Sequence, residues 1–241
     1  MKVLVIGDSC TDKFVYGECN RICPEAPVPV FNPIEQKSNG GMAKNVFNNL
    51  KSLASKWDID LITNTNEITK TRLVDIKTNQ MLLRVDEDDK CNRVKNIKDF
   101  DDYDAIVISD YNKGFLNEDD IKSLIKQYPI SFIDSKKIFD KWIDGTTFLK
   151  INEYEYNKNH KHLKNYKGNL LVTLGENGVR YNNTIIPPQR KAEVSDLSGA
   201  GDTFFAAFIF SYLTNKNVIE SIAFAQKCAL EVVEKKGVVV I

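Results

Sequence analysis

The sequence lacks an excess of charge of either sign. Its 241 residues contain 33 Lys and Arg against 33 Asp and Glu, so the formal net charge is zero. A balanced chain has no general electrostatic attraction for nucleic acid or for an anionic membrane surface. The sequence also lacks an apolar run as long as a membrane span. These absences predict a protein with no nucleic-acid partner and no membrane segment.

Paired metal-ligand motifs are missing as well. None of the five cysteines forms a Cys-x-x-Cys pair with another (Cys10, Cys19, Cys23, Cys91 and Cys228). The two histidines, His160 and His162, lie far from them in a stretch rich in Lys and Asn, where solvation is expected. A zinc site therefore has no support in the sequence. Reduced thiols in a cytoplasmic protein are the simplest expectation.

What is present fits one globular domain. The hydrophobic share of 42% and the charged share of 27% are typical of a soluble chain with a proper core. Strand-like segments recur at residues 2–6, 59–62, 105–109, 130–133, 147–149 and 170–173, and several end in polar residues before a helix or turn. This pattern predicts a parallel sheet flanked by helices, with a site at the C-terminal edge of the strands.

Helices are expected at residues 41–56, 117–127 and 218–235, with Asn117 capping the second of them. A hairpin is expected around residues 182–183, and a last strand at residues 238–241. Residues 13–37 contain closely spaced prolines, which exclude a helix or a central strand but suit an edge strand or a lid. Residues 71–76 and 80–85 predict a second hairpin.

Residues 196–203 (DLSGAGDT) carry the strongest chemical signal. Gly199 and Gly201 flank Ala200, Asp202 follows, and the apolar run 204–213 predicts a buried helix. Glycines let backbone N–H groups approach a ligand closely, and a helix N-terminus attracts anions. An adjacent carboxylate can accept a proton from a hydroxyl, so the motif suits phosphoryl transfer to an alcohol. The alternative is an ordinary turn in which Asp202 only caps the helix.

Two earlier features point to a ligand on the same edge. Gly40 and Gly41 open the helix expected at residues 41–56, and Asn45 lies one turn later, where its side chain can point back to the glycines. Asp12 follows the first strand. A carboxylate there can accept hydrogen bonds from sugar hydroxyls, or it can serve as a helix cap or turn former.

These motifs resemble those of a known family. Residues 196–203 are similar to the C-terminal signature of the ribokinase-like (PfkB) carbohydrate kinases, and Gly40-Gly41-x-Ala43-x-Asn45 is similar to their N-terminal signature. Residues 7–12, the proline-rich residues 21–30 and residues 109–114 (SDYNKG) resemble one branch, the D-glycero-β-D-manno-heptose-7-phosphate kinases. The resemblance covers nearly the whole chain in order.

The resemblance implies an α/β fold, the ribokinase-like three-layer αβα sandwich with a mostly parallel central sheet. A single domain, 1–241, would carry a small β-strand lid formed by residues of about 13–37 and 70–88. The implied function is that of an ATP- and Mg²⁺-dependent kinase that phosphorylates the anomeric O1 of the heptose 7-phosphate and forms a homodimer through its lid. Two alternatives remain open. One is a kinase for another sugar or a nucleoside, and the other is a shortened, non-catalytic binding protein.

The resemblance also implies a role for each matching residue. Asp202 would take the proton from the sugar, and the backbone of Gly199, Ala200 and Gly201 would hold the transferred phosphoryl group. The implied ligands of the sugar and its phosphate are Asp12, Gly40, Gly41, Asn45, Lys113, Lys136 and Arg84, with Arg72 as a further candidate. The implied ligands of ATP are Asn152, Glu155, Thr173, Gly175, Gly178 and Gln226, and Glu155 would also act on Mg²⁺ through water. For each basic residue, an ordinary surface charge is the alternative.

The chain departs from the family pattern in several places. Only a short linker joins Ile62 to Thr71, where the family has a further helix and strand. The chain stops at Ile241, without the last family helix and without the nucleotidyltransferase domain of bifunctional versions. The family's Phe-Ala-Asn is Phe224-Ala225-Gln226 here, and its Asp-Pro-Lys is Asp134-Ser135-Lys136. We expect these changes to loosen the lid and to alter nucleotide affinity.

Overall fold

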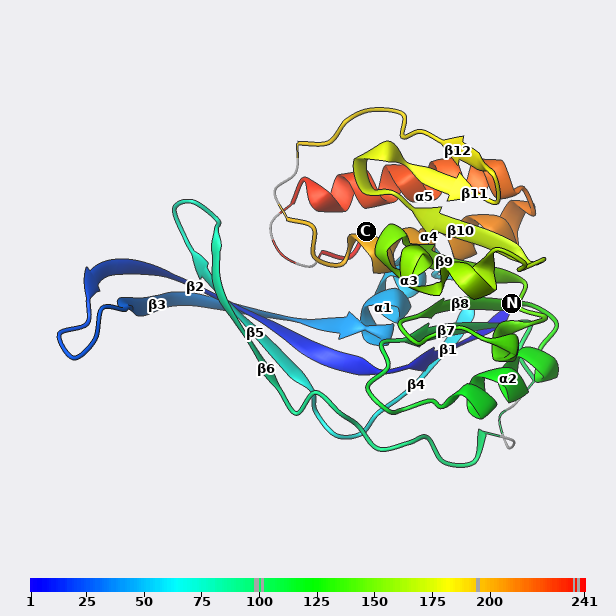
Figure 1. The fold of residues 1–241 in the computed structure, drawn as a ribbon, viewed down its shortest axis with the longest axis horizontal. Helices are drawn as coiled ribbons and strands as arrows, with labels where there is room; N and C mark the ends of the chain where they lie inside the picture. The colour runs from blue at the N-terminus through cyan, green and yellow to red at the C-terminus, as the bar shows by residue number, and fades with distance from the viewer. Residues whose placement is uncertain (98–99, 101, 194–195, 236, 238) are drawn as a thin grey trace.

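An eight-stranded sheet forms the centre of the molecule, and helices cover both of its faces (Figure 1). A computed structural model describes residues 1–241 apart from 98–99, 101, 194–195, 236 and 238. The strand order is β12 (Thr184–Ile186), β11 (Val179–Tyr181), β10 (Asn169–Thr173), β9 (Phe148–Asn152), β8 (Ser131–Ser135), β7 (Ala105–Asp110), β1 (Lys2–Gly7) and β4 (Asp58–Thr63).

The six strands from β10 to β4 are parallel to their neighbours, and β11 and β12 add an antiparallel hairpin at one edge. The apolar residues of β1 and β7 are buried because helices cover both faces of these strands. Parallel strands place all their carboxyl ends at one edge, so the polar residues that follow them gather there.

Two groups of helices form the outer layers. On one face, α1 (Ala43–Leu53), α4 (Ala200–Asn215) and α5 (Val218–Val233) share an apolar core with the sheet. On the other face, α2 (Glu118–Gln127) and α3 (Glu153–Leu163) contribute to a second core. Short 3₁₀ turns occur at η2 (Lys141–Ile143) and η3 (Gly175–Asn177). The predicted three-layer αβα sandwich is confirmed, and α4 is buried along most of its length, as its apolar sequence predicts.

A second, four-stranded sheet projects from this body as a lid (Figure 1). Its order is β3 (Pro29–Met42), β2 (Ser9–Ile22), β5 (Thr69–Asp75) and β6 (Met81–Glu87). The strand β3, which contains Pro29 and Pro33, lies at the edge of this sheet. An edge strand pairs on one side only, so it tolerates residues without a backbone N–H. Only residues 64–68 connect β4 of the body to β5 of the lid, so the short linker expected from the sequence is present.

Some predicted boundaries are wrong. Gly40 and Gly41 are residues of β3, and α1 begins at Ala43 instead of Gly41, because Met42 adopts a left-handed φ of 58° that interrupts both elements. The hairpin of β2 and β3 also extends beyond both ends of the predicted segment 13–37, because β2 begins at Ser9 and β3 ends at Met42. The helix α5 ends at Val233, two residues before its predicted end.

A last strand is expected at residues 238–241. Residues 239–241 are not in a strand, and Val238 lies outside the described residues. The Ile241 N–H donates to Asn49 Oδ1 of α1 at 3.1 Å, so the end of the chain packs on a helix instead of pairing with a strand. Among the described residues, no helix is long and apolar enough to cross a membrane.

Candidate active site

Asp202 lies in the first turn of α4, at the edge where the parallel strands end. The residue before the helix, Gly199, has a φ of 81°, a left-handed conformation that a side chain disfavours. The helix begins at Ala200, and its first turn leaves N–H groups without intrahelical acceptors and a partial positive charge. The Asp202 side chain is buried beside these groups. An anion and a carboxylate base can therefore meet at this point.

Two side chains orient the Asp202 carboxylate. The Tyr111 hydroxyl donates to Oδ1 at 2.7 Å, and Asn45 Nδ2 donates to Oδ2 at 3.1 Å. Burial raises the pKa of Asp202 to about 6, although both hydrogen bonds oppose the rise. Such a carboxylate is mostly ionised at neutral pH and accepts a proton more readily than an exposed aspartate does. The geometry and the pKa both suit a general base.

Asp8 holds the loop that carries Tyr111. Its carboxylate accepts the backbone N–H of Tyr111 at 2.7 Å and that of Phe115 at 3.1 Å. Asp8 follows β1 and is fully buried, and it also accepts a weak hydrogen bond from the Cys91 thiol at 3.4 Å. The position of Tyr111, and through it that of Asp202, depends on this buried carboxylate.

A cluster of buried charges lies beside the start of α4. Asp134, on β8, accepts hydrogen bonds from Lys136 at 2.9 Å and from Lys150 of β9. Burial opposes ionisation here, but the charges of the two lysines lower the pKa of Asp134 to about 2. The Lys150 ammonium lies 3.3 Å from the position that a Cβ on Gly201 would occupy. A cation is thus held against the glycine turn, where it can stabilise phosphoryl oxygens.

The Asn-x-x-Glu motif opens α3. Asn152 Oδ1 accepts the Glu155 N–H at 2.8 Å, and Glu155 Oε2 accepts the Asn152 N–H at 2.8 Å, so the two residues form a capping box. Glu155 Oε1 also pairs with Lys136 at 2.7 Å. No group of three His, Cys, Asp or Glu residues that could hold a metal occurs in the described part of the chain. A single carboxylate beside a phosphate site still fits Mg²⁺, which takes most of its ligands from water and phosphate oxygens.

The predicted sugar residues lie where the lid joins the body. A Cβ on Gly41 would lie 2.0 Å from Asp12 Oδ2, so a glycine is needed to leave room for this carboxylate. Arg72 of β5 donates to Asp12 Oδ1 and stacks on the Phe14 ring, with the guanidinium 5.0 Å from the ring centroid. Among the described residues, Asp12 Oδ2 has a single long contact, with the Cys10 thiol at 3.8 Å, and it can accept a hydrogen bond from a sugar hydroxyl.

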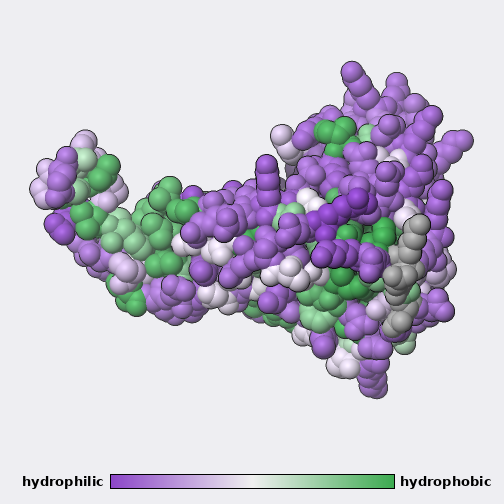
Figure 2. Space-filling model, turned by 90° about the horizontal axis from the view of Figure 1, so that it is seen from below, coloured by the Kyte–Doolittle hydropathy of each residue, from purple (hydrophilic) through white to green (hydrophobic). Residues whose placement is uncertain are grey.

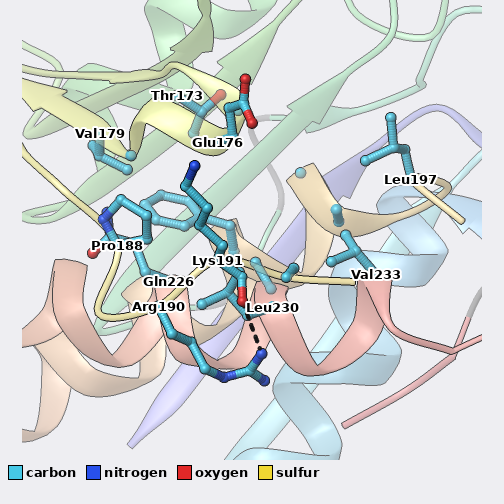
Figure 3. Close-up of a pocket in the computed structure, with 17 residues that line it drawn as sticks. Thr173, Glu176, Val179, Pro188, Arg190, Lys191, Leu197, Gln226, Leu230 and Val233 are labelled. Atoms are coloured by element: carbon cyan, nitrogen blue, oxygen red, sulfur yellow. Dashed lines mark hydrogen bonds between the residues drawn. The ribbon is translucent and has the colours of Figure 1, made fainter. Parts of the chain in front are cut away.

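A cavity of about 280 Å³ opens beside the first turn of α4 (Figure 3). Figure 3 shows Thr173 and Glu176 at one side of it and Leu230 and Val233 of α5 opposite. Four of the residues predicted to bind ATP line this cavity together with two from the glycine turn, namely Thr173, Gly175, Gly178, Gln226, Ala200 and Gly201. A mainly apolar cavity that ends at a helix N-terminus, which attracts anions, is suited to a nucleotide.

One unsatisfied atom in this cavity supports a purine amine as the ligand. Gln226 Nε2 donates to the Ile186 carbonyl at 2.9 Å, but the buried Gln226 Oε1 has no hydrogen-bond partner in the part of the chain that the structure describes. A buried acceptor left alone is costly, so a donor from a ligand is expected. The exocyclic amino group of adenine is such a donor, and the residues present therefore fit ATP.

The structure does not bring every predicted residue to Asp202. Arg84 lies on β6 and pairs with Asp86, and its side chain is 49% exposed. Lys113 pairs with Asp89 at the mouth of the lid, and the Gly40 backbone packs on the Lys44 side chain. Lys136 lies with Glu155 and Asp134, on the side expected to hold the phosphoryl group. The sugar-phosphate roles of these residues stay predictions.

Sequence reasoning missed several residues of this site. Lys150 is a lysine inside the apolar strand FLKIN, and a charged residue in a buried strand is itself a signal of function. Tyr111 lies in the motif SDYNKG, but no sequence rule joins its hydroxyl to a carboxylate 91 residues later. Asp8 lies in the motif of residues 7–12, where nothing local indicates its role, and its contacts with the backbone of Tyr111 and Phe115 identify one.

Comparison with known proteins agrees with this geometry. The profile of the pfkB family of carbohydrate kinases matches residues 34–240. The chain belongs to the pfkB carbohydrate kinase family. The bifunctional protein HldE of Helicobacter acinonychis is 32% identical over 295 residues, which cover 98% of this chain and 63% of the relative. The HldE protein of Nitratiruptor is 30% identical over 287 residues, which cover 98% and 62%.

This pfkB-family chain thus spans less than two thirds of the length of these relatives. The first alignment is longer than the chain, so that relative has internal segments that this chain lacks. Ribokinase from Thermotoga maritima superposes with a TM-score of 0.73 at 18% identity and covers 98% of this chain and 94% of its own. Arabidopsis thaliana ribokinase complexed with ribose and ATP superposes with a TM-score of 0.69 at 14% identity, over 98% and 93%. Both confirm the ribokinase-like fold.

Proposed function

We propose that this protein transfers the γ-phosphoryl group of ATP to the anomeric O1 of D-glycero-β-D-manno-heptose 7-phosphate, which gives the 1,7-bisphosphate for ADP-heptose biosynthesis. The observation that carries the reaction type is the buried Asp202, oriented by Tyr111 and Asn45 at the first turn of α4. The substrate is supported by the resemblance of residues 21–30 and 109–114 to the heptose-phosphate branch of the family.

The steps follow from the residues around Asp202. The O1–H of the sugar donates its proton to the Asp202 carboxylate as O1 forms a bond to the γ-phosphorus, and the bond from that phosphorus to the bridging oxygen of ATP breaks. The N–H groups of the first turn of α4 and the Lys150 ammonium stabilise the charge on the transferred group. Tyr111 and Asn45 keep the carboxylate directed at the sugar.

The remaining residues hold the two substrates. Thr173, Gly175, Gly178 and Gln226 contact ATP in the cavity, and Asp12, Gly41 and Asn45 contact the sugar hydroxyls. Mg²⁺ would neutralise charge on the nucleotide phosphates and would be held through water by Glu155, next to Asn152. All five cysteines are free thiols, which agrees with a reducing, cytoplasmic setting for a reaction that consumes ATP.

The lid supports a homodimer. One face of its edge strand β6 carries exposed apolar side chains, with Met81 53%, Leu83 55% and Val85 41% exposed. Figure 2 shows apolar side chains gathered on the projecting lid. A sheet with one apolar face needs a cover, and a second copy of the lid is self-complementary under two-fold symmetry. Sedimentation velocity should find a dimer that Leu83→Lys converts to a monomer, and a monomeric wild type would contradict this assignment.

A kinase assay on a panel of acceptors tests the proposed function. The panel contains the heptose 7-phosphate, the unphosphorylated heptose, ribose, fructose 6-phosphate and inosine, with formation of ADP and of the phosphorylated product followed in parallel. We expect turnover with the heptose 7-phosphate and none with ribose. Turnover restricted to unphosphorylated sugars or a nucleoside would replace the substrate assignment, and no turnover with any acceptor would refute the reaction.

A further inference from the structure

Lys70, Lys113 and Asp89 form a separate cluster between the lid and the body. Lys113, in the loop after β7, donates to Asp89 Oδ2. Lys70 of β5 lies 3.9 Å from Asp89 Oδ1 and 4.0 Å from Asp86 Oδ2. The two lysine side chains are only 13% and 19% exposed, so their charges are partly shielded from water. Two shielded cations on different elements thus share one carboxylate.

This cluster borders the sugar site. Lys70 is the register partner of Asp12 in the parallel pair of β2 and β5, so their side chains lie next to each other on one face of the lid. Lys113 follows Tyr111 by two residues, and the Tyr111 hydroxyl reaches Asp202.

Asp89 fits this position poorly. Although the Asp89 side chain is 41% exposed, its Oδ1 is buried and has no hydrogen-bond partner among the described residues, because the Lys70 ammonium at 3.9 Å is beyond hydrogen-bond distance. A buried acceptor without a donor is unfavourable. Asp89 also lies past the end of β6 at Glu87, in a segment without regular secondary structure, and follows Asp88 with its φ of 50°. Its carboxylate can therefore move without breaking a strand or a helix.

Lys70 is held more firmly than Asp89, because it is a residue of β5, which pairs with β2 on one side and β6 on the other. The Lys113 carbonyl accepts the Cys91 N–H at 2.8 Å, a contact that keeps the Lys113 loop beside the segment that carries Asp89. A phosphate dianion has more charge and more acceptor oxygens than a carboxylate, so it can satisfy both ammonium groups at once. The arrangement is that of an anion subsite occupied by a group of the protein itself.

We propose that Lys70 and Lys113 form the subsite for the phosphate of a phosphorylated sugar, and that Asp89 is an internal competitor which this phosphate displaces. The proposal rests on the proposed function, since it concerns the phosphorylated end of that substrate. An unphosphorylated sugar has no group that can displace Asp89, so the same contact favours phosphorylated acceptors. Asp89 is thereby a specificity-determining residue.

The variant Asp89→Asn tests this role. It removes the competing charge and keeps the shape of the side chain, so the KM for the heptose 7-phosphate should fall about three- to fivefold with kcat unchanged. Inorganic phosphate should inhibit this variant more strongly than the wild type by a similar factor. Asp88→Asn is the matched control, because it removes the same charge one residue away at an exposed position where Asn tolerates the positive φ. The control should leave both constants unchanged.

The variant Lys70→Met should act in the opposite direction. It removes one cation of the subsite, so the KM for the heptose 7-phosphate should rise about tenfold or more while the KM for ATP stays the same. An unchanged or raised KM in Asp89→Asn, or an equal effect of Asp88→Asn, would overturn the proposal. So would a normal KM for the sugar phosphate in Lys70→Met.

Calorimetric titration with inorganic phosphate, without ATP, separates this proposal from the proposed function. Binding to the wild type should be weak, tighter in Asp89→Asn and lost in Lys70→Met. If no sugar phosphate is turned over but this order of affinities is found, the kinase assignment fails and the subsite stands. If turnover is found without this order, the kinase assignment stands and the subsite is wrong.

Discussion

Replacing Asp202 by Asn should lower kcat by orders of magnitude and yet remove an energetic cost from the folded protein at neutral pH. Burial raises the pKa of Asp202 from the ordinary value of 3.8 to about 6. A shift of about two units corresponds to about 3 kcal/mol. The unfolding free energy of the protein is lower by this amount once Asp202 is ionised in the native state.

The sign of the pH dependence follows from proton linkage. Because the folded pKa is higher than the unfolded one, the contribution of Asp202 to stability is fully present below the unfolded pKa of 3.8 and is lost as the pH rises through about 6. The Asn variant has no such loss. Its unfolding free energy, relative to the wild type, should therefore increase by about 2–3 kcal/mol between about pH 4 and pH 8.

In the Asn variant, an NH₂ group replaces the Oδ2 atom that accepts from Asn45 Nδ2. Two donors then face each other, and the lost hydrogen bond costs about 1 kcal/mol. This cost is the same at every pH, so it shifts the difference between variant and wild type without changing its slope. Only the slope reports the ionisation of Asp202.

Urea unfolding of both proteins at several pH values between about 4 and 8 measures the difference, and kcat of the variant should fall about 10²–10⁴-fold. Asp88→Asn, which removes an exposed carboxylate, is the control and should give a flat difference. A flat difference for Asp202→Asn as well would show that burial does not perturb this carboxyl, and the base assignment would lose its physical reason. Retained kcat would refute the assignment directly.

Three further variants test the neighbours of Asp202. Tyr111→Phe removes a hydrogen bond that lowers the pKa of Asp202. The acidic limb of the pH profile of kcat/KM, expected near pH 6, should therefore move to higher pH. An unmoved limb would mean that the hydroxyl does not act on the base. Gly41→Ala places a Cβ 2.0 Å from Asp12 Oδ2, so the KM for the sugar should rise about tenfold with the KM for ATP unchanged in steady-state assays. Equal effects on both substrates would contradict this division of the site. Lys150→Met removes a cation from the glycine turn and should lower kcat about 100-fold or more, with circular dichroism checking the fold. A normal kcat in a folded variant would exclude that role.

Local patterns in the sequence predicted most of the order of the elements and the chemistry that we propose for residues 196–203. Strands that are apolar along their whole length require cover on both faces, so the αβα layers were predictable from residues 2–6 and 105–109. The closely spaced prolines predicted an edge strand for the lid, and Asp202 after a glycine turn predicted a base beside an anion site. These signals are local, because they depend on spacing and side-chain type within a few residues.

The tertiary structure alone decided which distant residues act together. No pattern within a few residues predicts the contacts of Tyr111 with Asp202, of Lys150 with the glycine turn or of Asp89 with Lys70. These contacts depend on which strands are neighbours in the sheet and on where the lid meets the body. The same holds for the end of the chain, where the β-like apolar residues 239–241 form no strand and Ile241 is held against α1. The glycine turn predicted a phosphate site and a base, but the pKa of Asp202 and the cations around it arise from burial and packing that only the folded chain creates.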